Sequence, residues 1–95
     1  MEEEIKILCV DDEPNVLHSL RRLFIDETYT FLTAASAEEG LKILTIETVQ
    51  IIISGYRMPN MNGVEFLREV RTRVPEPVRV ILSGFADTAS IVSSI

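Results

Sequence analysis

Polar residues follow the apolar segments of this 95-residue chain at positions where they could do chemistry. Asp11 and Asp12 come directly after the first apolar run, Gly55 follows a second run, and Ser83 follows a third. Adjacent carboxylates suit a hard cation such as Mg²⁺, which takes oxygen ligands and keeps several waters. The alternative is that both acids only favour the start of the next helix, where negative charge is stabilising. On spacing alone, these two interpretations have equal weight.

The segments that must position these residues have the composition of buried strands. Residues 5–10, 49–54 and 78–83 are nearly continuous apolar runs rich in β-branched side chains. Such runs are typical of a parallel sheet that is covered on both faces. Residues 29–34 have a mixed pattern, which predicts a strand at the edge of the sheet. Ligands of such sheets gather beyond the carboxyl ends of the strands, where the polar residues follow.

Helical patterns alternate with these strands. Pro14 fits the first turn of one helix, and Ser36 with Glu39 forms a capping signature for a second. Gly63 opens a third helix, and Asp87 fits the N-cap of a fourth. The apolar residues that we expect on the inner faces of these helices are Leu17, Leu20, Leu23, Phe24, Leu41, Leu44, Val64, Leu67, Val70, Val74, Ile91, Val92 and Ile95.

This alternation predicts an α/β fold with a doubly wound parallel sheet of the flavodoxin-like type and strand order 2-1-3-4. A complete fold of that type has one more strand and helix, which we expect to be absent from this chain. Residues 1–95 are therefore interpreted as one domain that is incomplete at its C-terminal end. The edge at residues 78–82 would then lie open, which favours self-association.

Composition excludes several function classes. The net charge is −6 and the pI is about 4.7, which argues against nucleic-acid binding by this segment. The single Cys9 cannot form an internal disulfide, and residues 2–4 are acidic, unlike the start of a signal peptide. Because no apolar run is long enough to cross a membrane, we expect a soluble, cytoplasmic domain.

Three motifs connect the chain with a known family. They are VDDEP at residues 10–14, YRMPNMNG at 56–63 and LSG at 82–84, each after a different predicted strand. In these motifs and their order, the chain resembles the receiver domains of two-component response regulators over essentially its whole length. Residues 85–87 are most similar to receivers attached to cyclic-di-GMP phosphodiesterase or transcription-regulator outputs.

The resemblance implies a phosphorelay module. In this family a sensor histidine kinase passes a phosphoryl group to an aspartate at the end of the third strand, beside a bound Mg²⁺. By resemblance, Asp11, Asp12 and the main-chain carbonyl of Arg57 bind the metal, and Ser83 is the switch hydroxyl. The expected partners are a histidine kinase and an output domain or protein, with homodimerisation as a further expectation.

One position departs from the family in a way that changes its chemistry. Gly55 stands where the phosphate-accepting aspartate is expected, and glycine can neither carry a phosphoryl group nor ligate a metal. We therefore expect no phosphorylation at this position and weakened Mg²⁺ binding. Ser54 is not a substitute, because successive strand residues point to opposite faces. The preserved flanking motifs favour a recent or deliberate replacement over an old loss.

Two further function classes fit parts of the sequence. The first is a phosphorylation-independent module for protein interaction or dimerisation. The second is an enzyme on the same fold, which the sequence disfavours. A haloacid-dehalogenase-type phosphatase needs an aspartate two residues after its nucleophile, whereas Glu13 follows Asp11 at that spacing. A flavin site needs a hydroxyl- and glycine-rich loop after the first strand, where the acids found here would repel phosphate.

Overall fold

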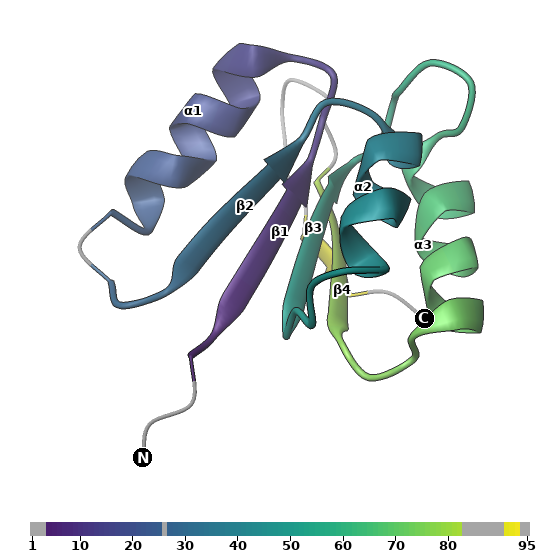
Figure 1. Ribbon diagram of the computed structural model, residues 1–95. Helices are drawn as coiled ribbons and strands as arrows, with labels where there is room; N and C mark the ends of the chain where they lie inside the picture. The colour runs from purple at the N-terminus through teal and green to yellow at the C-terminus, as the bar shows by residue number, and fades with distance from the viewer. Residues whose placement is uncertain (1–3, 26, 83–90, 94–95) are drawn as a thin grey trace.

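The protein forms a single sheet flanked by helices in a computed structural model that describes residues 4–25, 27–82 and 91–93. The strand order is β2-β1-β3-β4-β5, and β1 to β4 are mutually parallel (Figure 1). The predicted α/β fold with parallel order 2-1-3-4 is therefore confirmed, with the mixed strand at the edge. The strands are β1 (Lys6–Val10), β2 (Thr30–Ala34), β3 (Ile51–Gly55), β4 (Val78–Leu82) and β5 (Ile91–Ser93).

The last described segment corrects the sequence prediction. A helix is predicted to include Ile91 and Val92, but both lie in β5, which pairs antiparallel with β4. In this register Val92 is opposite Ile81, so the short strand satisfies backbone groups at an edge that would otherwise be open. No fifth parallel strand occurs among the described residues. The predicted cap Asp87 and the predicted core residue Ile95 lie outside them.

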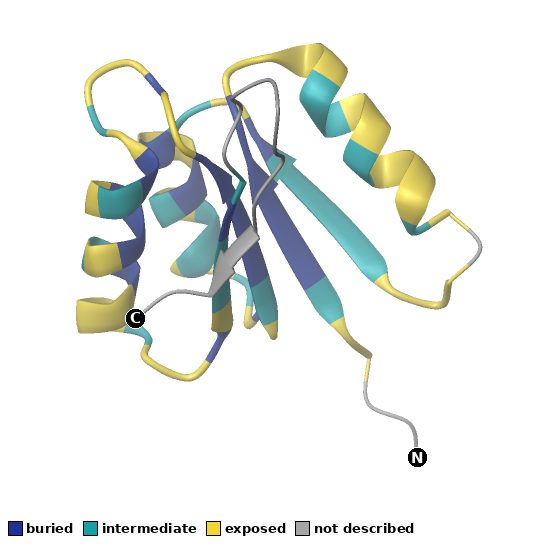
Figure 2. Ribbon diagram, turned by 180° about the vertical axis from the view of Figure 1, so that it is seen from behind, coloured by how far each residue is buried: buried dark blue, intermediate teal, exposed yellow. Residues whose placement is uncertain are grey.

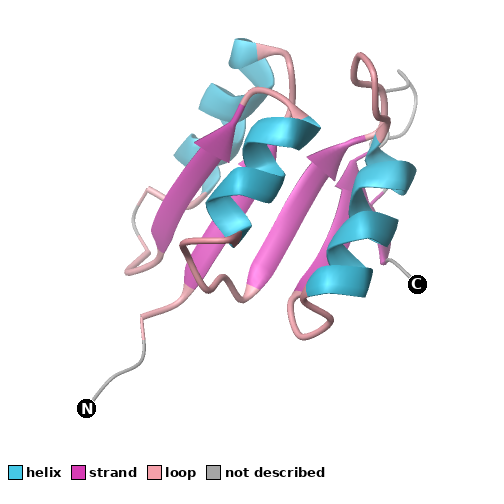
Figure 3. Ribbon diagram, turned by 45° about the vertical axis from the view of Figure 1, so that its right-hand side comes forward, coloured by secondary structure: helices cyan, strands magenta, loops and turns pink. Residues whose placement is uncertain are grey.

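Helices cover both faces of the sheet. Helix α1 (Pro14–Leu23) lies on one face, and α2 (Ala37–Leu44) and α3 (Gly63–Arg73) lie on the other (Figure 3). Alternate residues of β1 point to opposite faces, so Ile7 and Cys9 pack toward α1 whereas Leu8 and Val10 pack toward α2 and α3. Figure 2 shows that β1 and β3 are the most buried elements, as their continuous apolar sequences predict.

One inner-face prediction is wrong, and one core residue was not predicted. Leu23 is 71% exposed, because α1 ends there and the next residue, Phe24, turns back to pack near Phe31, with ring centroids 5.9 Å apart. Phe66, which the sequence pattern did not assign to the core, is fully buried and is among its largest side chains. Its ring lies 3.0 Å from the point where a side chain at Gly40 would begin, so the missing side chain makes room for it.

The helix starts follow capping chemistry. Pro14 stands at the start of α1, and Ser36 accepts a hydrogen bond from the N–H of Glu39 at 3.1 Å, both as predicted. The structure adds a capping box that the sequence prediction missed, in which Asn62 and Glu65 exchange side-chain and backbone hydrogen bonds of 2.9 and 3.0 Å. This box fixes the start of α3, immediately after the loop that follows β3.

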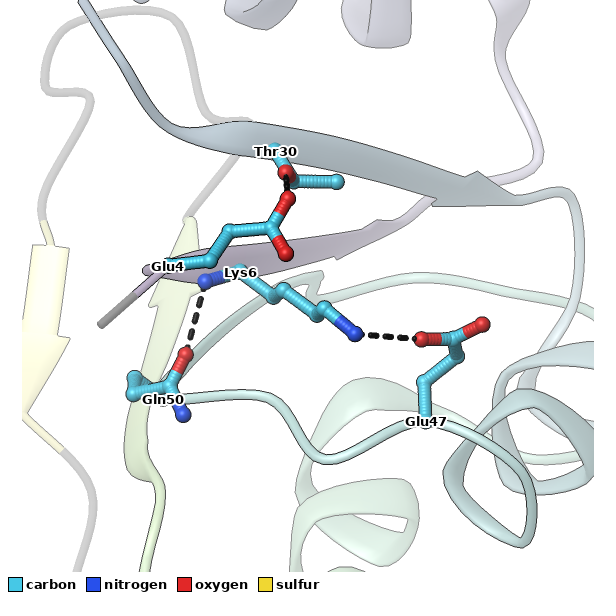
Figure 4. A network of polar contacts seen from close by, with 5 residues as sticks. All are labelled: Glu4, Lys6, Thr30, Glu47 and Gln50. Atoms are coloured by element: carbon cyan, nitrogen blue, oxygen red, sulfur yellow. Dashed lines mark hydrogen bonds and ion pairs between the residues drawn. The ribbon is translucent and has the colours of Figure 1, made fainter. Parts of the chain in front are cut away.

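Polar contacts connect the amino ends of β2, β1 and β3 (Figure 4). The Lys6 ammonium contacts the Glu47 carboxylate at 2.8 Å, and the Lys6 N–H donates to the Gln50 side chain at 2.7 Å. The Thr30 hydroxyl donates to Glu4. Partly exposed ion pairs contribute little stability, at most about 1 kcal/mol each. We interpret these contacts as fixing where the strands start and not as a major source of stability. They lie at the end of the sheet away from the motif residues.

We expect the Cys9 thiol to be unreactive in the folded protein. The side chain is fully buried, and this burial raises its pKa to about 12. Because the folded pKa exceeds the ordinary value of 9.0, the neutral thiol's contribution to stability is complete below pH 9 and is lost as the pH rises further. Mass spectrometry at pH 8 should show no iodoacetamide adduct without urea and complete alkylation in unfolding urea. Alkylation of the folded protein at the rate of an unstructured cysteine peptide would contradict this burial.

Candidate functional site

Strand pairing brings the carboxyl ends of β1 and β3 side by side (Figure 1). Val10 is the register partner of Ser54, so Asp11 leaves the sheet next to Gly55. The Asp11 N–H donates to the Ala34 carbonyl at 3.1 Å, which extends the pairing with β2 by one residue. Both Asp11 and Gly55 are therefore held by sheet backbone, and the structure brings together the two positions that the sequence analysis singled out.

Position 55 faces the Asp11 carboxylate. A Cβ on residue 55 would lie 2.3 Å from Asp11 Oδ2 and 3.0 Å from Asp11 Cγ. Asp11 is only 8% exposed, and its Oδ1 accepts a hydrogen bond from the Glu13 N–H at 2.9 Å. The carboxylate is thus fixed at one oxygen, while its other oxygen occupies the space of the missing side chain.

Ser54 points elsewhere, as predicted. Its side chain is fully buried, and its hydroxyl donates to the Gly55 carbonyl at 2.9 Å. This carbonyl is also where α3 begins, because a Cβ on Gly63 would lie 2.1 Å from it. The Gly63 N–H in turn donates to the Tyr56 carbonyl at 2.9 Å. The sequence predicts a helix start at Gly63 but gives no sign of this close approach, which needs a residue without a side chain.

Met58 and Asn60 shape the loop between β3 and α3. Met58 is buried against the core that faces α2 and α3, and Asn60 has a φ of 71°, in the left-handed region that asparagine tolerates. Tyr56 is 42% exposed, and Arg57 follows it directly. Because β3 ends at Gly55 and runs parallel to β1, the loop starts at the carboxyl edge of the sheet, beside the acidic residues after β1. Ser83, the predicted switch hydroxyl, lies outside the described residues.

The electrostatics at this edge favour a cation. The pKa of Asp11 is raised above its ordinary value, and burial is the largest cause. The hydrogen bond from the Glu13 N–H acts in the opposite direction, and the negative charges of Asp12 and Glu13 raise the pKa further. Ionising Asp11 therefore costs more than ionising an aspartate in water, and a nearby cation would offset part of that cost.

The residues present fit a Mg²⁺ ion, with a reduced ligand set. Mg²⁺ is commonly held by one or two carboxylates with waters completing its shell, and Asp11 with Asp12 supply two. No group of three or more histidine, cysteine or acidic side chains is placed to bind a metal within the part of the chain that the structure describes. A carboxylate at position 55 would add the third acid, but glycine provides none.

Replacing Asp11 by asparagine is expected to stabilise the metal-free protein at pH 7 by about 0.5–2 kcal/mol, as at other relieved functional sites. The amide oxygen of the new side chain can keep the hydrogen bond from the Glu13 N–H. The substitution removes the buried negative charge. Because the Asp11 pKa is raised on folding, the wild type should lose stability relative to this variant as the pH rises through that pKa. Urea denaturation at pH 4 and pH 7 measures the difference. Equal wild-type and variant stabilities at both pH values would contradict the burial cost.

Comparisons with known proteins agree on the family. The profile of the response regulator receiver domain matches residues 7–95. The hydrogenase transcriptional regulatory protein HoxA of Cupriavidus necator is 40% identical over 94 residues, which are 99% of this chain and 19% of that protein. The GlrR transcriptional regulatory protein of Escherichia coli is 33% identical over 88 residues, or 93% of this chain and 20% of that protein. The chain thus spans about a fifth of these relatives.

Solved structures give the same result. The signal receiver domain of an HD domain-containing protein from Pseudomonas fluorescens is 29% identical, with a TM-score of 0.84 over 90% of this chain and 68% of that one. The response regulator TrrA of Thermotoga maritima, solved in complex with Mg²⁺-BeF, is 30% identical, with a TM-score of 0.80 over 86% of this chain and 71% of that one. No helix among the described residues has the length and apolarity to span a membrane.

The family model covers nearly the whole chain, and the fold has the family's parallel strand order. The chain belongs to the family of response regulator receiver domains, which are non-enzymatic signalling modules of two-component systems.

Proposed function

We propose that this domain is a receiver module that takes no phosphoryl group at its usual position, because Gly55 replaces the accepting aspartate. One observation carries the proposal. Residue 55 ends β3 with its Cβ direction aimed at the Asp11 carboxylate, 2.3 Å away. A side chain at this position would enter the acidic site. Glycine leaves that site without the carboxylate on which the family's phosphoryl transfer depends.

The same proposal assigns the metal ligands. Asp11, Asp12 and the main-chain carbonyl of Arg57 would hold Mg²⁺, and Ser83 would be the switch hydroxyl. The ion would neutralise charge next to a phosphoryl group. With only two carboxylates, we expect a lower affinity than in receivers that keep the third.

The whole protein's role extends the proposal. Since relatives such as HoxA are transcriptional regulators about five times as long, we propose that this module belongs to a longer cytoplasmic protein. Its partners would be a sensor histidine kinase and an output domain or partner protein. The absent acceptor also supports the second candidate function, a phosphorylation-independent interaction or dimerisation module. In both versions this segment acts through protein contacts and not through nucleic acid or membrane binding.

Intact-mass spectrometry of a Gly55→Asp variant tests the assignment of position 55. The variant is incubated with Mg²⁺ and acetyl phosphate, and peptide mapping then locates any added group. We expect one phosphoryl group on residue 55, because the rest of the site is retained. A Gly55→Asn variant is the matched control, since it has the same shape without a nucleophilic carboxylate. If the Gly55→Asp variant stays unmodified at residue 55, the assignment is wrong.

A further inference from the structure

We propose that Asp11 has taken the place of the missing acceptor and can itself receive a phosphoryl group. The inference rests on the proposed function, since it uses the same site and the same class of donor. It adds a modification site at the end of β1, on a residue otherwise expected only to bind metal.

The position of one oxygen atom carries the proposal. In any aspartate, ordinary bond lengths place the carboxylate oxygens about 2.4 Å from the residue's own Cβ. Asp11 Oδ2 lies 2.3 Å from where a Cβ of residue 55 would be. Asp11 Oδ2 therefore lies in space that a side chain at position 55 would take, at a distance from the Cβ position similar to that of an aspartate's own oxygens.

Oδ2 is the proposed nucleophile, because a hydrogen bond engages the other oxygen of Asp11. The hydrogen bond from the Glu13 N–H engages Oδ1 and fixes the orientation of the carboxylate. Ser54, which precedes Gly55, is fully buried and donates to the Gly55 carbonyl. Asp12 and Glu13 are exposed on the loop after β1, one and two residues beyond the end of the sheet pairing.

The proposed step is a transfer between two carboxylates. Asp11 Oδ2 attacks the phosphorus of an acyl phosphate, a new O–P bond forms, and the bond from phosphorus to the donor's carboxylate oxygen breaks. The electron pair of the broken bond leaves with the donor carboxylate. With a phosphohistidine donor, the N–P bond breaks and the imidazole nitrogen keeps the pair. The product on Asp11 is a mixed anhydride, which hydroxylamine cleaves, unlike the ester that a serine would give.

The test uses the full 95-residue chain with Mg²⁺ and acetyl phosphate, and follows intact mass, hydroxylamine sensitivity and the modified peptide. Gly55→Ala is the informative variant, because its methyl group must push Asp11 Oδ2 from 2.3 Å to ordinary contact at 3.4–4 Å. A misplacement of about 1 Å can slow a reaction about a hundredfold. Glu38→Gln is the matched control, since it removes an exposed carboxylate in the first turn of α2, outside the site.

We expect the wild type and Glu38→Gln to gain one hydroxylamine-labile phosphoryl group on Asp11, with Gly55→Ala about a hundredfold slower and Asp11→Asn unmodified. Circular dichroism checks that each variant is folded. If the wild type stays unmodified while Gly55→Asp is modified at residue 55, the Asp11 proposal is wrong and the proposed function stands. If neither protein is modified, both proposals fail. A group mapped to any residue other than Asp11 in the wild type also overturns the inference.

Discussion

Replacing Gly63 by alanine is expected to lower the free energy of unfolding by about 3 kcal/mol, the upper end of the usual cost of overpacking. The added Cβ would lie 2.1 Å from the Gly55 carbonyl oxygen and 3.2 Å from the Ser54 hydroxyl. The first contact is with strand backbone, so relief requires α3 to move away from the end of β3. Urea denaturation followed by circular dichroism measures the loss.

A second glycine provides the control for this prediction. A Cβ on Gly40, inside α2, would meet the Phe66 ring and a Val10 methyl, both at 3.0 Å. These are side-chain atoms that can shift, and alanine gains about 1 kcal/mol over glycine in a helix. Gly40→Ala should therefore change stability by less than about 1 kcal/mol. Equal losses in the two variants would show that the Gly63 backbone contact is not special.

Restoring a carboxylate at position 55 is expected to couple stability strongly to Mg²⁺. In Gly55→Asp the new side chain and Asp11 compete for one space, since Asp11 Oδ2 already lies 2.3 Å from the new Cβ. Asp11 must rotate, and without metal the carboxylates repel each other. A cation that binds only the folded state at a hundred times its Kd adds about 2.7 kcal/mol. We expect the variant to gain at least about 1.4 kcal/mol more from Mg²⁺ than the wild type, the equivalent of tenfold tighter binding.

Thermal unfolding with and without saturating Mg²⁺, at constant ionic strength, measures this coupling. Gly55→Asn controls for shape, because it fills the same space without the charge and should respond to Mg²⁺ no more than the wild type. The same stabilisation of the wild type and Gly55→Asp by Mg²⁺ would mean that residue 55 does not face the metal site.

Much of the fold could be predicted because each central strand has the composition of a buried parallel strand. The runs before Asp11 and Gly55 are β-branched and continuous, so burial on both faces and parallel pairing follow from composition. Once the carboxyl ends are known to share an edge, the meeting of the motif residues also follows. The prediction that Ser54 faces away from residue 55 needed only the alternation of strand side chains.

Other features depend on tertiary contacts that no local pattern encodes. Leu23 and Phe24 are both apolar at the end of α1, and Phe24 is the one that turns inward, against the rings of Tyr29 and Phe31. The helix predicted over Ile91 and Val92 became β5 because the β4 edge offered backbone partners. Phe66 could have been found from the small residue at Gly40, but pairing the two requires knowing that α2 and α3 lie next to each other.

The same limit applies to the site. The sequence shows that position 55 lacks a carboxylate, but it gives no sign that Asp11 turns into the vacated space. That orientation depends on the Glu13 N–H holding one oxygen and on the register of β1 with β3. Both are properties of the assembled sheet, which is why Asp11 was predicted only as a metal ligand.

The central claim is that the acidic edge of this sheet remains a receiver site around Gly55. A Mg²⁺ titration of the ¹⁵N-labelled wild type, followed by amide chemical shifts, tests it most directly. The claim predicts that the largest shifts fall on residues 11–13 and 55–57, at the carboxyl ends of β1 and β3. Shifts centred on other acidic residues such as Glu38 and Glu39, with residues 11–13 and 55–57 unmoved, would contradict it.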